Sequence, residues 1–147
     1  MNPQVQTTLI LIVVAFLLLG GAQGSRQVPA SSADVTLLAR LIDAEAGGEP
    51  YRGKVAVGAV VVNRMKDDRY PNTLREVIYQ PGQFAVNAMS TIRTPSDESV
   101  RAAEAALRGE DPTRGALFFY NPKTARLDPW WNSRRALIQI GNHLFLR

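Results

Sequence analysis

The first regular pattern of apolar positions after residue 32 has the period of an α-helix. Positions three and four residues apart share one face of a helix. The apolar stripe consists of Leu37, Leu38, Leu41 and Ile42. Ser32 or Asp34 is suited to cap the start of this helix, and Gly47–Gly48 to end it in a left-handed conformation. We therefore expect a helix that carries residues 37–45.

Glu45 falls in the middle of this stripe, in the last turn of the expected helix, where the pattern requires an apolar residue. A carboxyl group in an apolar setting resists ionisation, because desolvation disfavours its charged form. Such a group can hold a proton near neutral pH and then donate it, as a general acid does. The alternative is a boundary glutamate that reaches water or caps a neighbouring element. The stripe alone leaves both interpretations open.

A second helix is expected after Glu49–Pro50, since Pro suits the first turn of a helix. Its apolar face consists of Val55, Ala59, Val62 and Met65 and ends near Lys66. The Val-rich composition would also fit a strand. The length and the small residues favour a helix that packs closely against a neighbour.

Two further helices carry their own start signals. Thr73 and Glu76 have the spacing of a capping box, which predicts a short helix through Tyr79. Pro81–Gly82 then predicts a turn. Another helix is expected from Ser96 to Arg108, with Gly109 at its end.

The character of the chain changes after residue 111, where two β-prone runs follow. Ala116 to Tyr120 and Ala136 to Phe145 are separated by a loop that contains Pro, Asn and Trp. Helices first and strands afterwards predict an α+β fold, mainly helical, with a small antiparallel β ribbon near the C-terminus.

The N-terminal segment differs from the rest of the chain. Leu9 to Leu19 is an unbroken apolar run, and Gly20 to Gly24 supplies small residues of the kind that precede a signal cleavage site. The run is short for a membrane span, which favours a removed signal peptide, although a membrane anchor through residues 9–22 remains the alternative. In either case we expect export from the cytoplasm. The expected organisation is a signal peptide or anchor over 1–24, a linker over 25–32 and one folded domain over 33–147.

Composition narrows the chemistry. The 147 residues include 46% hydrophobic positions, enough for a real core, and contain no Cys and one His. Disulfides and thiolate metal sites are therefore excluded, and His143 cannot form a zinc site by itself. A carboxylate-only cation site stays open, but we expect no metal and no cofactor. The net charge of +4 comes from basic residues scattered among acids, which favours an anionic polymer such as cell wall over nucleic acid.

Several predicted loops combine aromatic rings with amide side chains. They contain Gln83, Phe84, Asn87, Tyr120, Asn121, Trp130, Trp131, Asn132, Asn142 and His143. Sugars stack their C–H faces on aromatic rings and hydrogen-bond at their rims, so this combination is typical of a carbohydrate site. Core packing is the alternative for each ring taken alone. The adjacent pair Trp130–Trp131 resists that interpretation, because two neighbours cannot both point into one core. His143 fits a partly buried histidine better than a catalytic base.

Four ordered blocks of the sequence resemble a known family. They read EAGGEPYRGKVAVGAVVVNRM, YPNTLREVIYQPGQF, DPTRGALFFYNP and IGNHLF. These blocks are similar to the catalytic domain of the spore cortex-lytic and germination cell-wall hydrolases of the SleB/CwlJ type, over essentially all of residues 33–147. The resemblance implies a lysozyme-like, mainly helical domain that cleaves peptidoglycan glycan strands, in the better-studied members as a lytic transglycosylase. It also implies that the first Glu of the first block is the catalytic acid. That residue is Glu45, the position that the helical stripe singles out.

The expected partner is therefore peptidoglycan, in the cell wall, in the spore cortex or at the outer face of the membrane; the sequence indicates no particular accessory protein. The expected substrate-binding residues are Glu49, Gln83, Phe84, Tyr120, Asn121, Trp131 and His143. Glu49 is further expected to position substrate or to cap the next helix.

Two alternatives to a transglycosylase remain at this point. In the first, a hydrolase with two carboxylates, a muramidase or glucosaminidase, would use Glu49, Asp67 or Asp68 to activate water. In the second, a membrane-tethered module would bind peptidoglycan without cleaving it.

Overall fold

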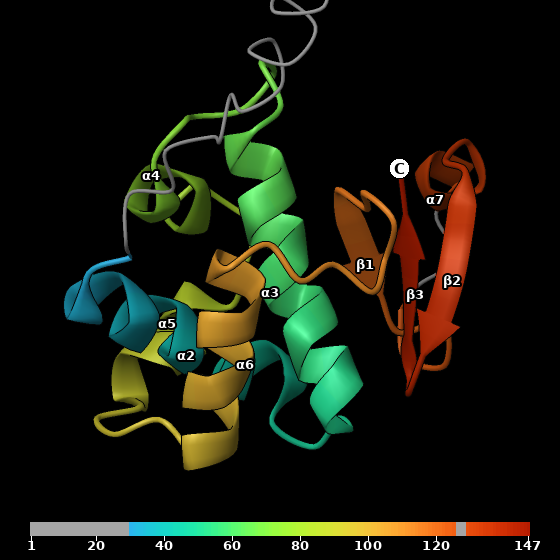
Figure 1. Cartoon of the computed structure of the whole chain (residues 1–147). Helices are drawn as coiled ribbons and strands as arrows, with labels where there is room; N and C mark the ends of the chain where they lie inside the picture. Colours follow the sequence, from blue (N-terminus) through green and yellow to red (C-terminus); the bar gives the residue numbers. More distant parts are fainter. Residues whose placement is uncertain (1–29, 126–128) are drawn as a thin grey trace, which may run out of the picture.

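The computed structural model describes residues 30–125 and 129–147, so the expected signal peptide or anchor lies outside the described residues, as does nearly all of the linker. A block of helices stands beside a small sheet (Figure 1). The elements are α2 (Ser32–Ala46), α3 (Tyr51–Met65), α4 (Leu74–Ile78), α5 (Val86–Thr91), α6 (Asp97–Leu107), β1 (Phe118–Tyr120), α7 (Pro129–Asn132), β2 (Ala136–Ile140) and β3 (His143–Leu146). The predicted α+β, mainly helical class with a C-terminal antiparallel ribbon is confirmed.

Helix α3 lies at the centre of the fold. It contacts α2, α4 and α6 on one side and the sheet on the other, so it is buried almost all round from Gly53 to Val62. Its contact with α6 is close: a Cβ added at Gly58 would lie 2.8 Å from Cβ of Ala106. The small residues of this run therefore serve the tight helix packing that the sequence predicts.

The ends of α2 differ from the expectation. Ser31 is the N-cap, and Asp34 is the reciprocal partner of its capping box, so the prediction of Ser32 or Asp34 as the cap is wrong. Gly47 ends the helix in the right-handed region, with φ −54° and ψ −37°, so the predicted left-handed ending is also wrong. A Cβ at Gly47 would lie 2.7 Å from the carbonyl oxygen of Asp43, and this close approach favours glycine there.

The predicted starts of two other helices are confirmed. Thr73 accepts a hydrogen bond from the backbone N–H of Glu76 at the start of α4, and Ser96 caps α6. Gly109 follows α6 with φ +100°. The sequence did not predict α5 and α7, which are short, and α5 begins without a side-chain cap.

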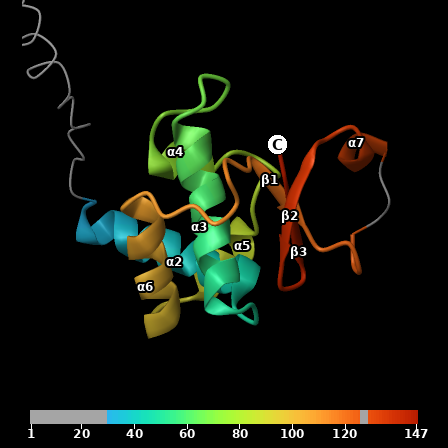
Figure 2. The same cartoon turned by 45° about the vertical axis from the view of Figure 1, so that its right-hand side comes forward.

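The sheet has the strand order β1-β3-β2, and both pairings are antiparallel. The predicted β run over 136–145 is therefore two strands, joined by a tight turn at Gly141–Asn142, where Gly141 has φ +59°. The sheet lies on the α3 side of the helices, and α7 stands beyond it, farther from the helical block (Figure 2). Residues of β1 and α7 together form one wall of a cavity that residues of α2 and α3 also line.

Candidate active site

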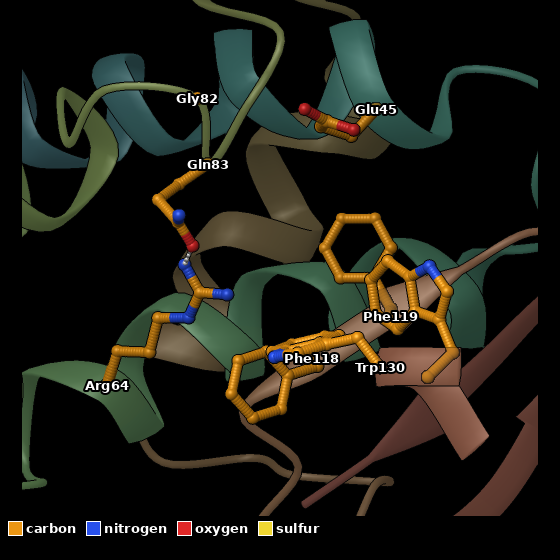
Figure 3. Close-up of a pocket in the computed structure, with 8 residues that line it drawn as sticks. Glu45, Arg64, Gly82, Gln83, Phe118, Phe119 and Trp130 are labelled. Carbon is orange, nitrogen blue, oxygen red and sulfur yellow. Dashed lines mark hydrogen bonds between the residues drawn. The ribbon is translucent and has the colours of Figure 1, made fainter. Parts of the chain in front are cut away.

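A cavity of about 340 Å³ opens between the helical block and the sheet. Its wall contains Glu45, Arg64, Gly82, Gln83, Phe118, Phe119, Trp130 and Trp131. These residues come from α2, α3, the turn before α5, β1 and α7, five segments far apart in the sequence. Figure 3 shows Glu45 and Arg64 entering the cavity from different helices, with Gln83 beside Arg64.

Glu45 is half-buried in the last turn of α2. Burial raises the pKa of its carboxyl group, and this effect exceeds the opposing effect of a hydrogen bond that Oε1 accepts from the backbone N–H of Ala85 at 2.5 Å. Within the described chain, no Lys, Arg or His forms an ion pair with it. The carboxyl group can therefore keep a proton at higher pH than an ordinary glutamate.

Aromatic rings form the sheet side of the cavity. The ring of Trp131 stacks on Tyr120, with centroids 4.6 Å apart and an angle of 27° between the planes. Trp130 meets Trp131 edge-on at 4.8 Å and Phe118 edge-on at 5.1 Å. Rings that support one another in this way give a rigid apolar platform beside a polar carboxyl group. Such a platform suits a sugar ring.

Arg64 is a cavity residue that the sequence interpretation missed. Its Nε donates to the carbonyl oxygen of Leu117 at 2.8 Å, and Nη1 donates to Oε1 of Gln83 at 3.1 Å. The guanidinium group lies over the rings of Tyr70, Phe84 and Phe118 at 5.2, 4.9 and 5.5 Å. Burial lowers the pKa of this group, because the apolar setting disfavours its charge. Arg64 lies three and four residues after Val61 and Val60, on the same buried face of α3. A charged residue on an apolar helix face is the same signal that singled out Glu45.

The structure brings three of the predicted site residues together at the cavity, namely Glu45, Gln83 and Trp131. Phe84 and Tyr120 lie behind the wall: Phe84 is buried beneath the guanidinium of Arg64, and Tyr120 lies against Trp131.

Three other predicted residues are not part of the cavity wall. Asn121 accepts a hydrogen bond from the backbone N–H of Lys123 at 2.9 Å and so stabilises its own turn. His143 is buried, with its ring edge-on to Phe119 at 5.1 Å. The third is Glu49, whose carboxylate hydrogen-bonds to the β2–β3 turn of the sheet.

Glu49 ties the α2–α3 connection to the β2–β3 turn. Its Oε2 accepts from the backbone N–H of Asn142 at 2.8 Å, and Oε1 accepts from the side-chain amide of Asn142 at 3.0 Å. The predicted capping of the next helix is wrong, because α3 has Pro50 as N-cap and no side-chain cap. Burial alone would raise the pKa of Glu49, but the two hydrogen bonds from Asn142 lower it below its ordinary value.

This contact should make stability depend on pH. Because the folded state lowers the pKa of Glu49, its stabilisation is complete above the ordinary value of 4.5 and is lost as pH falls through the folded value. We expect Glu49→Gln to destabilise the protein at pH 7 and to have a smaller effect at pH 3. Urea unfolding of both proteins at the two pH values measures the difference, since the other titrating groups are common to both. An equal difference at pH 3 and pH 7 would contradict the assignment.

The geometry defines a class of site in which one partly buried carboxyl group faces an aromatic-lined cavity. The chain belongs to the Cell Wall Hydrolase family, which it matches over residues 48–146. The resemblance predicted from the four sequence blocks is therefore confirmed. The match begins three residues after Glu45, so the role of that residue depends on the geometry described above.

Individual proteins similar to this chain point to the same family. The chain is 41% identical over 121 residues to the spore cortex-lytic enzyme of Halalkalibacterium halodurans. The aligned region covers 80% of this chain and 36% of that protein. It thus spans about a third of the length of this relative. Two solved structures are also similar, each with a TM-score of 0.75: the catalytic domain of the germination-specific lytic transglycosylase SleB from Bacillus anthracis, and the catalytic domain of SleB from Bacillus cereus. The first is 37% identical and covers 82% of this chain and 98% of its own; the second is 38% identical and covers 86% and 100%.

Proposed function

We propose that the domain cleaves the glycan strands of peptidoglycan, with Glu45 as the proton-transferring group. The observation that carries this proposal is the position of Glu45: a carboxyl group whose pKa is raised by burial, at the wall of a cavity lined by aromatic rings. The similarity to spore cortex-lytic enzymes and to a lytic transglycosylase supports the same chemistry.

In the proposed reaction, the protonated Glu45 donates its proton to the glycosidic oxygen, and the bond from that oxygen to the muramoyl C1 breaks. The carboxylate that remains accepts the proton of the muramoyl 6-hydroxyl, whose oxygen bonds to C1. The products are a 1,6-anhydromuramoyl end and a free hydroxyl on the leaving sugar. Glu45 ends the cycle protonated, and no water is consumed.

The surroundings of Glu45 favour this route over a two-carboxylate hydrolase. Within residues 30–125 and 129–147, it is the only carboxylate that lines this cavity. Glu49 is engaged by Asn142, and Asp67 accepts bonds of 2.8 Å from Arg69. Hydrolases of the two-carboxylate type hold the second group across the scissile bond. The substrate's own 6-hydroxyl supplies a nucleophile at high effective concentration instead.

We assign substrate contacts by position. Trp131 would stack on a sugar face, backed by Tyr120, and Gln83 would hydrogen-bond at the rim. Phe84 would support the cavity from behind. Glu49, Asn121 and His143 would act through the shape of the sheet and its turns rather than by touching substrate.

The proposed site of action is outside the cytoplasm, on wall or spore-cortex peptidoglycan. The apolar run over 9–22 would serve for export or as a tether. Among the helices that the structure describes, none has the length and apolar character needed to span a membrane. The relatives' names place them in spore cortex lysis and germination, and the same setting is proposed for this chain.

Incubation of the purified protein with isolated peptidoglycan tests the proposal. We expect the turbidity of the suspension to fall as soluble fragments are released. Co-sedimentation of the protein with peptidoglycan, without any loss of turbidity, would instead identify a binding module without catalytic activity.

A further inference from the structure

Arg64 is a buried cation for which no carboxylate of the described residues supplies a counter-charge. Only 4% of its surface is exposed, and its two hydrogen bonds are to neutral oxygens, of Leu117 and Gln83. No carboxylate of the described chain lies within ion-pair distance of it. A buried charge is costly when nothing of opposite sign compensates it. The presence of Arg64 at the cavity wall is therefore better explained by ligand binding than by folding stability.

A second guanidinium group lies next to the same wall. Arg134 is over the ring of Trp130 at 4.4 Å and over the ring of Phe118 at 5.1 Å. Its Nε is buried and has no hydrogen-bond partner. The ring of Phe118 therefore has two guanidinium groups against it, from Arg64 and Arg134, and the described residues provide neither with an ion pair.

The positive charge and the acid are separate parts of one cavity. Arg64 enters from α3 and Glu45 from α2, and no ion pair joins them (Figure 3). Burial, and not a nearby cation, dominates the pKa of Glu45. A ligand that spans the cavity thus meets a proton donor at one place and an uncompensated positive charge at another.

We propose that Arg64, Phe118 and Arg134 form an anion subsite, which binds a carboxylate carried by the glycan strand beside the bond that is cleaved. The inference rests on the proposed function and adds the substrate's charge to it. Guanidinium groups bind carboxylates through charge-assisted hydrogen bonds in a planar fork, and these bonds are strong in a partly desolvated site. Peptidoglycan offers two sources of such a carboxylate: the lactyl group of muramic acid once the stem peptide is removed, and the stem peptide itself. An N-acetylglucosamine oligomer offers neither.

Binding to strands of defined charge tests the subsite. The full chain carrying Glu45→Gln is titrated, with tryptophan fluorescence as the readout, against glycan strands stripped of stem peptides and against strands that retain them. Each preparation is compared with the same strands after their carboxylates are capped as methylamides. We expect about a tenfold or greater preference for the free carboxylate over the capped form in at least one preparation. The preparation that shows it identifies the source of the carboxylate.

Substitution at Gln83 then tests whether Arg64 carries the preference. Gln83→Glu would place a carboxylate against the guanidinium of Arg64, so the preference should fall close to onefold. Gln83→Met is the matched control: it removes the hydrogen bond to Arg64 and the proposed rim contact without adding charge. Affinity for both free and capped strands should fall, but the ratio between the two should persist. Arg134→Gln, at a half-buried position, should weaken the preference without abolishing it. Melting temperatures confirm that each variant is folded.

The outcomes separate the two proposals. Equal binding of free and capped strands in both preparations would overturn the anion subsite and leave the proposed function intact, as would an undiminished preference in folded Gln83→Glu. Binding of no strand by the folded protein would overturn both. Cleavage of strands by the Glu45→Gln background at the wild-type rate would overturn the proposed role of Glu45 alone, whatever the charge preference.

Discussion

Replacement of Glu45 by Gln should reduce the rate of glycan cleavage by roughly 10²- to 10⁴-fold, the usual contribution of general acid–base catalysis, while the protein remains folded. Glutamine keeps the volume of the side chain and an oxygen that can accept the hydrogen bond from Ala85, but its amide has no acidic proton that can be transferred to the glycosidic oxygen. The substitution should therefore abolish proton transfer while it leaves the packing and the hydrogen bond to Ala85 nearly unchanged. Initial rates of release of soluble fragments, measured beside the melting temperature, give both quantities.

Asp43, two residues earlier on the same helix, provides a matched control. Its carboxylate accepts hydrogen bonds from the backbone N–H of Ser96 at 2.7 Å and from the hydroxyls of Ser96 and Ser99. Burial would raise the pKa of Asp43, but these bonds lower it, the opposite of the shift at Glu45. Asp43→Asn should therefore lower the melting temperature and leave the rate of the folded protein close to wild type. A folded Glu45→Gln protein with the wild-type rate would refute the catalytic assignment.

Replacement of Gly141 by Ala should destabilise the protein by roughly 2–6 kcal/mol, the sum of backbone strain and a steric clash. Gly141 has φ +59°, a conformation that residues with a Cβ rarely adopt. An added Cβ would also collide with Oε2 of Glu49 and lie 2.9 Å from Cδ of Pro50. The clash would push apart the contact that holds the β2–β3 turn against the α2–α3 connection. Urea unfolding measures the loss of stability.

Two further variants separate the causes. Gly82 has a similar φ of +71°, but nothing lies within 4 Å of its added Cβ, so Gly82→Ala should cost only the backbone strain, roughly 1–2 kcal/mol. Gly141→Ala should also cost less in a Glu49→Ala background, where the carboxylate is absent. If Gly141→Ala and Gly82→Ala lose the same stability, the expected clash of the added Cβ with Glu49 contributes nothing.

Local signals in the sequence predicted most of the helical block. The spacing of Thr73 and Glu76 and the Ser96 cap act within a single turn, so they can be recognised without knowledge of the rest of the fold. The departure at Gly47 arose because glycine has more than one use: a close approach to a carbonyl oxygen selects it as surely as a left-handed conformation does.

The site was only partly predictable, because its parts meet across long separations. Glu45 could be singled out from the apolar stripe of its own helix, and Arg64 carried the same signal, a charge on a buried face, although it was not recognised. The partner of Glu49 is 93 residues away, and no local pattern indicates Asn142. The aromatic loops pointed to sugar binding, but the fold decides which rings line the cavity and which, like Phe84, lie behind it.

The chemistry of the released ends tests the central claim most directly. Peptidoglycan is digested in water enriched in oxygen-18, and the soluble fragments are analysed by mass spectrometry. With Glu45 as the only carboxylate of the cavity among the described residues, the muramoyl 6-hydroxyl should be the nucleophile. The account predicts 1,6-anhydromuramoyl ends that contain no heavy oxygen; reducing ends that carry oxygen-18 would show that water attacks and would contradict it.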